Sequence, residues 1–427
     1  MSELWRDRDF LKLWTANTVT QLGTQVTFLA LPLAAILVLH ASALEVALLG
    51  AAEMAPLLLF NLPAGVWVDR MRRRPLMIAA DLGRAASLAS IPVAHAFGAL
   101  TLGQLYGVAF LNGFLAILFD LAYLTFLPAL VAREQLSEGN AKLEASRAGA
   151  QLAGPGLAGG LIGLIGAPAA ITADAASFGL SGALVSLIRR REEPPAREGR
   201  EPLWTELREG VRYVLGQPYL RILTVCTGAW SLFASMMAAV FLVYAVRTLD
   251  LSAGVIGIIF MLGNAGQLVA AAGCSRVTRR FGVGPTIVWA GVISSLFLVV
   301  TPLAPKARPE PFLAVGFAVE MGAGMLFNIN QLTLRQAITP KRLLGRMTAV
   351  VRFMYLGAAP LGFLIGGVVA SQIGLRAALW FGAIGAIVAM LPLPFSSIRL
   401  LQTLPEIDEE PDLLPLAVPP LVELADA

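Results

Sequence analysis

The chain has 427 residues, of which 57% are apolar and only 14% charged, and its mean hydropathy is +0.73. A soluble protein has about 25% charged residues, so we expect lipid rather than water around most of this surface. The net formal charge of +4 comes from arginines gathered at the ends of apolar runs. This distribution favours membrane topology and argues against nucleic-acid binding.

Twelve apolar runs follow one another along the chain, and each can cross hydrocarbon about 30 Å thick as a helix. They lie at residues 12–39, 45–68, 76–97, 102–128, 143–164, 168–188, 219–246, 253–275, 284–304, 311–334, 346–372 and 376–397. None alternates with the period of two that a barrel strand has. The pattern predicts an all-α membrane protein with twelve transmembrane helices, the first of which is an uncleaved span.

Lys and Arg are unevenly divided between the short loops. If the N-terminus is cytoplasmic, the outer loops carry only Arg247, Lys306, Arg308 and Arg376, and nearly all other loop cations lie inside. Positive charge is retained on the cytoplasmic side of a membrane. The sequence therefore predicts a multi-pass protein of the inner (cytoplasmic) membrane with both termini in the cytoplasm.

The two halves of the chain resemble each other at an offset of about 208 residues, which relates Gly65 to Gly273 and Gly166 to Gly374. Such duplication is typical of secondary carriers, whose sites lie near the midplane between the repeats. We predict two pseudo-symmetric six-helix bundles at residues 1–190 and 218–398. A cytoplasmic linker with a surface helix spans 191–217, and 399–427 forms an acidic, disordered cytoplasmic tail.

The segment GVWVDRMRRRP, Gly65–Pro75, lies between the second and third runs. It resembles the loop motif of the major facilitator superfamily, except that Arg72 stands where that family has Gly, and the resemblance extends from Phe10 to about Arg399. It implies a major facilitator fold and a latch that holds one cytoplasmic closure. The latch residues are Gly65, Asp69, Arg70, Arg73 and Arg74. The alternative is that these arginines only set topology.

The fifth run contains Gly154, Pro155 and Gly159, which resemble the Gly-Pro motif of exporters in the same superfamily. Small residues allow helices to approach closely, and proline removes a backbone hydrogen bond and favours a bend. The resemblance implies export. The alternative is that these residues serve helix packing alone.

The segments Phe10–Pro32 and Met77–Ala85 resemble the branch that includes the enterobactin exporter and macrolide efflux proteins. This resemblance implies export of amphipathic compounds, by proton antiport where coupling is known. The buried arginine that many proton antiporters have in the fourth span is missing, and Ala109 and Asn112 are the nearest equivalent positions.

Charged side chains inside the runs are expensive, at about 2.5–3.5 kcal/mol each, so each needs a partner, a cavity or a proton. We expect Asp81 and Arg84, spaced i,i+3, to form a pair, and Asp120 to face cytoplasmic-end arginines such as Arg133 or Arg147. Deep carboxylates are suited to carrying protons. The candidates for proton coupling, in order of preference, are Glu320, Asp174 and Glu53, followed by Asp81 and Asp120.

Polar residues within the runs are candidates for lining a substrate cavity, although hydrogen bonding between helices is the alternative for about half of them. They are Asn17, Gln21, Gln25, Arg84, Asn264, Gln267, Asn328, Gln331 and Arg352. Arg352 is expected either to pair with Glu320 or to bind an anionic group of the substrate. No nucleophile elbow, phosphate-binding Gly loop or metal-ligand spacing occurs, so we expect no catalytic residue, no metal and no enzyme activity.

Together these features predict a secondary active transporter that exports amphipathic small molecules, such as a drug-like compound or a siderophore. We expect alternating access with proton antiport, no cofactor beyond the proton gradient, a monomer in the lipid bilayer and a small-molecule substrate. A metabolite importer of the same superfamily is the first alternative. A non-transporting membrane receptor or scaffold is the second.

Overall fold

The computed structural model describes residues 3–189 and 203–405, apart from the side chains at 3, 61–62, 65–66, 69–70, 124–125, 129, 133 and 203–207. This part of the chain is helical and contains no strand. Eleven helices are long and apolar enough to cross a membrane, and Leu375–Met390 is a shorter apolar helix. The predicted all-α fold is therefore confirmed, and the number of spans agrees with twelve when this last helix is counted. The predicted start of the linker, 191–202, and the acidic tail, 406–427, lie outside the described residues.

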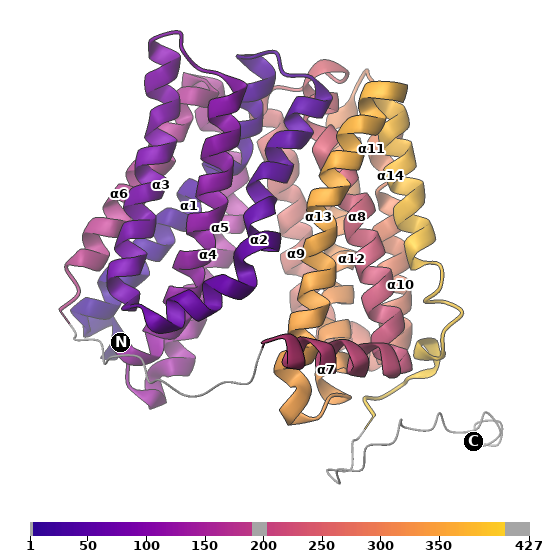
Figure 1. The fold of residues 1–427 in the computed structure, drawn as a ribbon. Helices are drawn as coiled ribbons and strands as arrows, with labels where there is room; N and C mark the ends of the chain where they lie inside the picture. Colours follow the sequence, from indigo (N-terminus) through magenta and orange to yellow (C-terminus); the bar gives the residue numbers. More distant parts are fainter. Residues whose placement is uncertain (1–2, 190–202, 406–427) are drawn as a thin grey trace, which may run out of the picture.

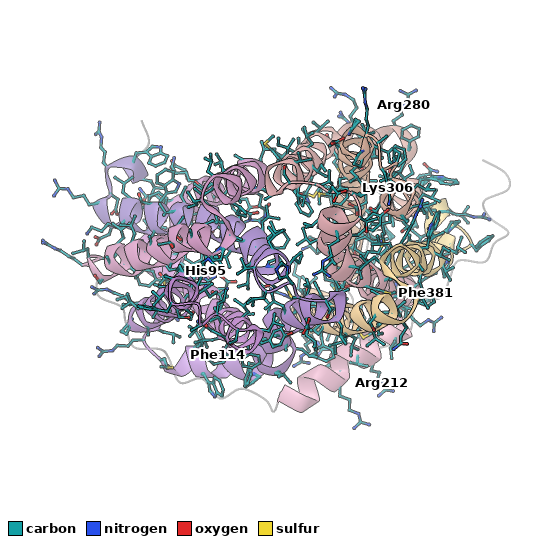
Figure 2. All side chains as sticks on the ribbon, turned by 90° about the horizontal axis from the view of Figure 1, so that it is seen from above. His95, Phe114, Arg212, Arg280, Lys306 and Phe381 are labelled. Carbon is teal, nitrogen blue, oxygen red and sulfur yellow. The ribbon has the colours of Figure 1, made fainter. Side chains whose placement is uncertain are left out.

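The helices form two groups that lie side by side (Figures 1 and 2). The N-terminal half contains α1 (Arg8–Leu37), α2 (Ala43–Arg70), α3 (Arg73–Ala96), α4 (Leu102–Leu130), α5 (Leu136–Ile165) and α6 (Ala167–Ser186). The C-terminal half contains α8 (Pro218–Arg247), α9 (Ala253–Phe281), α10 (Val283–Phe297), α11 (Val300–Leu303), α12 (Pro309–Ala337), α13 (Leu344–Ile373) and α14 (Leu375–Met390). Short 3-10 turns occur at Glu3–Arg6, Arg133–Gln135, Lys341–Leu343 and Ser397–Leu400. Between the two groups, α2 packs on α13 and α5 packs on α9.

Local sequence explains where several helices begin and end. Ser42 and Glu45 form a capping box at the start of α2, in which Ser42 N donates to Glu45 Oε2 at 2.6 Å. The last span was predicted to reach residue 397, but α14 ends at Met390. Pro392 and Pro394 follow directly, and proline cannot donate the hydrogen bonds that would continue the helix.

The predicted duplication is visible in the backbone at two glycines. Gly166 joins α5 to α6 with φ +83° and ψ 158°, and Gly374 joins α13 to α14 with φ +90° and ψ 161°. Positive φ of this kind is accessible mainly to glycine. The same chain reversal therefore occurs at equivalent places in the two halves.

The helix α7 (Leu203–Gly216) lies across one end of the C-terminal half (Figure 1). Val214 is fully buried, and Tyr213 Oη donates to the Ile338 carbonyl at 2.8 Å. Glu209 forms ion pairs with Arg342, at 2.9 Å, and with Arg346. These contacts attach α7 to the C-terminal half at the turn that precedes α13.

The two ends of the molecule differ in charge. We call the end that carries the α2–α3 turn, α7 and Lys341–Arg346 the arginine-rich end, and the end with loops 38–42, 97–101, 248–252 and 304–308 the opposite end. The described chain begins and ends at the arginine-rich end (Figure 1).

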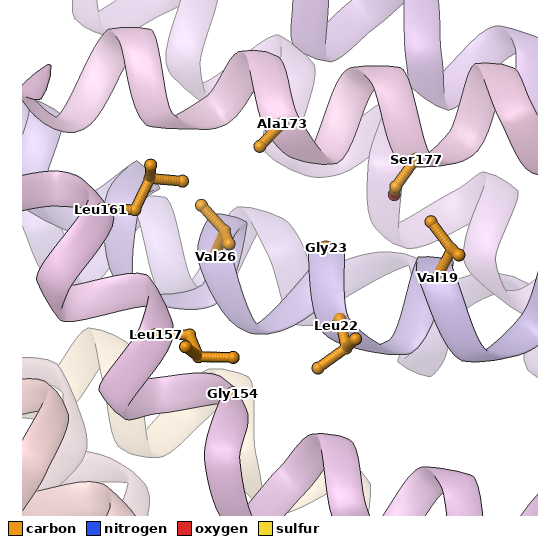
Figure 3. A pocket seen from close by; sticks show the side chains of 9 residues that line it. All are labelled: Val19, Leu22, Gly23, Val26, Gly154, Leu157, Leu161, Ala173 and Ser177. Carbon is orange, nitrogen blue, oxygen red and sulfur yellow. The ribbon is translucent and has the colours of Figure 1, made fainter.

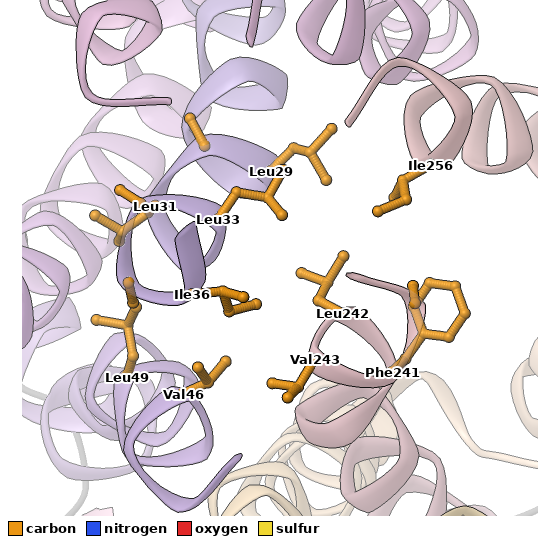
Figure 4. Close-up of a cluster of buried hydrophobic side chains, with 14 of the residues drawn as sticks. Leu29, Leu31, Leu33, Ile36, Val46, Leu49, Phe241, Leu242, Val243 and Ile256 are labelled. Atoms are coloured by element: carbon orange, nitrogen blue, oxygen red, sulfur yellow. The ribbon is translucent and has the colours of Figure 1, made fainter. Parts of the chain in front are cut away.

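Buried apolar side chains join the two halves at the opposite end. One cluster contains Leu29 and Ile36 of α1, Phe241 and Leu242 of α8 and Ile256 of α9 (Figure 4). At the arginine-rich end each half has a cluster of its own, around Phe126 in the N-terminal half and around Leu334 in the C-terminal half. The halves are therefore closed against each other at the opposite end, whereas at the arginine-rich end the described side chains form no core shared by the two halves.

Candidate functional site

The turn between α2 and α3 carries the predicted latch motif. The side chains of Gly65, Asp69 and Arg70 lie outside the described residues. Arg74 Nε donates to the Val185 carbonyl at 3.2 Å, and its Nη2 donates to the Ser186 carbonyl at the end of α6. A cation is favoured at a helix C-terminus, where carbonyl groups are left unpaired.

The Gly-Pro segment of α5 lies at the contact between the two halves. A side chain at Gly159 would meet the backbone of Ala253, and one at Gly257 of α9 would meet the carbonyl group of Pro155. Gly154 instead lies against Gln25 of α1. The motif therefore permits close backbone contact of α5 with both α9 and α1.

One polar face of α1 points towards the C-terminal half. Asn17, Gln21 and Gln25 share this face with Phe28, whose ring lies 6.2 Å from the ring of Phe260 on α9. The amide groups of these three residues form no hydrogen bond to another described residue. Asn17 is buried, at 6% exposed, whereas Gln21 and Gln25 are half-buried, so Gln21 and Gln25 are the amides available to water or to a ligand between the halves.

Behind α1, the interior of the N-terminal half contains a buried arginine. Arg84 of α3 is only 7% exposed, and its Nε donates to Asn112 Oδ1 of α4 at 2.8 Å. Its guanidinium also stacks on the ring of Phe178 of α6, with Cζ 3.7 Å from the ring centroid. Arg84 of α3 thus contacts α4 at Asn112. Asn112 is one of the two positions nearest to the place where many proton antiporters have a buried arginine in the fourth span.

Two fully buried carboxyl groups lie in the same layer of helices. Asp81 Oδ2 accepts a hydrogen bond from Ser181 Oγ at 2.6 Å, and Asp174 Oδ1 accepts one from Ser177 Oγ at 3.0 Å. The second oxygen of each carboxyl group has no hydrogen bond within 3.5 Å to a described residue, although Thr27 of α1 lies beside the carboxyl group of Asp174. We call Asp81, Arg84, Asn112, Asp174, Phe178 and Ser181 the Arg84 network.

The predicted ion pair between Asp81 and Arg84 is wrong. No carboxylate oxygen of a described residue lies within 4.0 Å of the guanidinium nitrogens. Asp81 instead accepts a hydrogen bond from Ser181 of α6, and Arg84 donates to Asn112 of α4. Arg84 nevertheless interacts electrostatically with four carboxyl groups, those of Asp174, Asp81, Asp120 and Glu53. Arg84 was also a candidate for lining a substrate cavity. It lies inside the N-terminal half, and not beside the polar face of α1 that carries the other candidates of this half.

Asp120 and Arg352 approach each other from different halves. Asp120 of α4 and Arg352 of α13 are both exposed, and the charge of Arg352 acts on Asp120 across the space between the halves. The expected neighbour Arg147 instead pairs with Glu144, and the side chain of Arg133 lies outside the described residues.

Glu320 stands apart from the other carboxyl groups. It lies in α12 beside Ser294 of α10, and no basic nitrogen of a described residue lies within 4.0 Å of it. The structure therefore does not pair Glu320 with Arg352. Asp174, Asp81, Glu53 and Asp120 gather around Arg84, and Glu320 is the one candidate in the C-terminal half.

The polar candidates of the C-terminal half serve different contacts. Asn264 Nδ2 donates to the Gln151 carbonyl of α5 at 2.6 Å and thereby joins the two halves. Gln331 Nε2 donates to Asn328 Oδ1 at 3.2 Å, within α12. Gln267 is half-buried and forms no hydrogen bond to a described residue.

Sequence reasoning missed one buried cation. Arg335 directly follows the predicted span 311–334, which makes it one of the loop cations expected on the inner side. It lies instead in the last turn of α12, is 3% exposed and donates from Nη2 to Thr227 Oγ1 at 3.3 Å. Its spacing after Asn328 and Gln331 places all three residues on one face of a helix, and this pattern could have identified Arg335 as a residue of the span rather than of the loop. Phe178 and Ser181 were missed because aromatic and hydroxyl side chains are common in any span.

Three comparisons with known proteins agree with this architecture. A family described as "Transmembrane secretion effector" matches residues 4–424. The multidrug efflux pump Tap of Mycolicibacterium fortuitum is 28% identical over 364 residues, which cover 83% of this chain and 87% of that protein. An uncharacterised major facilitator transporter, y4rN of Sinorhizobium fredii, is 30% identical over 271 residues, 60% of this chain and 65% of that protein.

Solved structures show the same fold. A bacterial homologue of the iron transporter ferroportin in its inward-facing state has a TM-score of 0.71 and 18% identity, covering 92% of this chain and 99% of that one. The nucleoside transporter NupG has a TM-score of 0.72 and 11% identity over 91% and 98% of the two chains. The match along nearly all of the chain, together with the two packed groups of helices, shows that this protein belongs to the transmembrane secretion effector family of major facilitator superfamily transporters.

Proposed function

We propose that the protein exports amphipathic small molecules across the cytoplasmic membrane, in exchange for protons and by alternating access. The observation that carries the proposal is the Arg84 network, a buried set of charges that lies directly behind the polar face of α1. The similarity to a multidrug efflux pump over 83% of the chain supports the direction and the substrate class.

The arginine-rich end is assigned to the cytoplasm, because positive loop charges are retained on that side of a membrane. Both ends of the described chain then face the cytoplasm. With this orientation, the halves are closed on the outer side and apart on the cytoplasmic side. This is the state in which a carrier collects its substrate from the cytoplasm or from the inner leaflet.

Protons are assigned to the carboxyl groups of the N-terminal half. Among the described residues, Arg84 is the cation that acts on Asp174, Asp81, Asp120 and Glu53 together, and Arg352 acts on Asp120 alone of these, so four acids share two cations and their charges are not balanced. Burying a carboxylate without a cation of its own costs desolvation free energy, and binding a proton removes this cost because it neutralises the charge. This proposal prefers Asp174 and Asp81 to Glu320, which was ranked first from the sequence.

Coupling follows if the protonated and charged forms of this network favour different states of the carrier. Asp174 contacts α1 at Gly23, so a change in its charge acts on the helix whose other face lines the space between the halves. A ligand or proton shifts such an equilibrium only by its difference in affinity for the two states. The amphipathic character of the substrate agrees with the mixture of amides and aromatic rings on that face of α1.

The proposal is tested first by a growth-inhibition panel of lipophilic cations, macrolides and catechol siderophores, with expression of the protein or of an empty vector. Compounds that the protein protects against are then offered to inside-out membrane vesicles with an acidic lumen. We expect accumulation in the lumen that nigericin abolishes. Gradient-driven accumulation in right-side-out vesicles would indicate the metabolite importer instead. Failure of every compound to move in either preparation would favour a receptor or scaffold.

A further inference from the structure

A pocket of about 240 Å³ lies between α1, α5 and α6, at the middle of the N-terminal half (Figure 3). Val19 and Val26 of α1, Leu157 and Leu161 of α5, and Ser177 of α6 line it. Ser177 is the single lining residue with a polar side chain. Gly154 of the Gly-Pro motif forms part of the wall.

The pocket faces the bilayer and not the space between the halves. Val19 and Val26 lie on the face of α1 opposite to Asn17 and Gln21, which point towards the C-terminal half. At the mouth, Leu157 is 63% exposed. The helices α5 and α6 pack far less on each other than each packs on α1, so the surface of α1 is reached between them.

A buried acid lies directly behind this apolar pocket. A side chain at Gly23, in the pocket wall, would overlap both Ser177 Oγ and Asp174 Oδ1. Ser177 Oγ donates a hydrogen bond to Asp174 Oδ1 at 3.0 Å. Asp174 Oδ2 has no hydrogen bond within 3.5 Å to a described residue, although Thr27 of α1 lies beside the same carboxyl group, and Asp174 is completely buried. No basic nitrogen of a described residue lies within 4.0 Å of Asp174.

We infer that this pocket is a membrane-facing binding site for an amphipathic amine, whose apolar part fills the space between α5 and α6 and whose ammonium group is held by Ser177 and Asp174. The inference rests on the proposed export function, because it specifies the class of substrate that enters from the lipid. A cation is selected because the nearest charged group is an acid with no basic nitrogen of a described residue within 4.0 Å.

The size of the pocket limits the occupant. Drug-sized ligands occupy about 300–1,000 Å³, so 240 Å³ accepts one ring system or a short alkyl segment and leaves the rest of a larger molecule in the bilayer. An uncharged lipid chain would fill the apolar part equally well but would leave Asp174 without a neighbouring cation. The charge of the ligand therefore separates the two occupants.

The test uses the full-length protein in phosphatidylcholine nanodiscs and two photoreactive probes, an aryl diazirine with a primary amine and its uncharged N-acetyl analogue. We expect light-dependent adducts on the peptides that contain Leu157 and Val26, with about tenfold more adduct from the amine than from the amide. A charge-assisted hydrogen bond of about 1.5–3 kcal/mol gives at least this ratio.

Two pairs of variants control the assignment. Ala173→Leu narrows the exposed mouth of the pocket and should reduce labelling by the amine, whereas Ala176→Leu, also exposed on α6 but outside the pocket, should not. Asp174→Asn should remove the preference for the amine and retain labelling by the amide, which reports that the pocket is still folded.

Equal labelling by the two probes would identify a lipid-filled crevice and overturn the inference, as would a normal amine signal in Ala173→Leu. Labelling is read without transport, so the result is independent of the vesicle experiments. Amine-selective adducts without any export would contradict the proposed function and leave the site standing.

Discussion

Ser181 of α6 donates a hydrogen bond of 2.6 Å to Asp81 of α3, and both residues are completely buried. This bond connects two helices through one oxygen of an acid whose other oxygen has no hydrogen bond to a described residue. The interior of the N-terminal half is therefore arranged around charges and hydroxyl groups rather than around apolar packing alone.

Ser181→Ala should lower the apparent melting temperature of the detergent-solubilised protein. The change leaves both oxygens of Asp81 without a hydrogen bond, which costs about 1–3 kcal/mol. Thermal unfolding followed by intrinsic fluorescence measures the effect. Ser371→Ala is the matched control, because Ser371 is exposed and bonds only to Val368 in its own helix. Equal melting temperatures of the two variants would contradict the importance of the bond.

Arg84→Lys should reduce gradient-driven transport almost as strongly as Arg84→Gln, by about tenfold or more. Lysine keeps the charge but cannot both stack on Phe178 and donate from a planar group to Asn112. Initial rates in vesicles, normalised to the amount of folded protein, give the comparison. Arg147→Gln removes an exposed arginine that pairs with Glu144 and should leave the rate unchanged. Full activity of Arg84→Lys would mean that only the charge matters.

Sequence patterns predicted the helices well because membrane spans are dictated by length and polarity. The apolar run 102–128 became α4 at Leu102–Leu130, for example. Errors occur at the arginine-rich end, where α5 begins at Leu136 rather than at 143, because its first turns are polar and extend beyond the apolar run.

The candidate site was predicted less completely, because contacts between helices are not encoded by spacing within one helix. Asp81 and Arg84 were identified as unusual charges, but their partners Ser181 and Asn112 come from other helices. The i,i+3 spacing suggested that the two charges pair with each other, and helix packing gave each a different neighbour. The Arg84 network thus depends on how α3, α4 and α6 pack together, which the sequence of one helix does not show.

Gly159→Ala should destabilise the protein or slow transport, whereas Gly160→Ala should not. A methyl group at Gly159 meets the backbone of Ala253, which cannot move aside like a flexible side chain, while the space at Gly160 is open. Overpacking of this kind costs about 1–3 kcal/mol. Melting temperature and initial transport rate of the adjacent pair provide the measurement. Identical behaviour of both variants would argue against a tight contact between α5 and α9.

The attachment of α7 should weaken at high pH. Burial raises the pKa of Tyr213, partly opposed by a hydrogen bond with Thr339, and the Tyr213 hydroxyl donates to Ile338 only while it keeps its proton. A raised pKa in the attached state means that this stability is present below about pH 10 and is lost as pH rises further. Hydrogen exchange in α7 should therefore increase above pH 10. Tyr213→Phe should lack this dependence and lose about 0.5–1.5 kcal/mol at neutral pH.

The most direct test of the account is the movement of protons that accompanies the substrate. Proteoliposomes that contain a pH-sensitive dye and the wild-type protein should show a proton flux opposite to the substrate flux. Asp174→Asn and Asp81→Asn should abolish this flux, and Glu320→Gln should retain it. Substrate-driven proton movement that persists in both N-terminal variants, or that disappears only in Glu320→Gln, would contradict the role given to the Arg84 network.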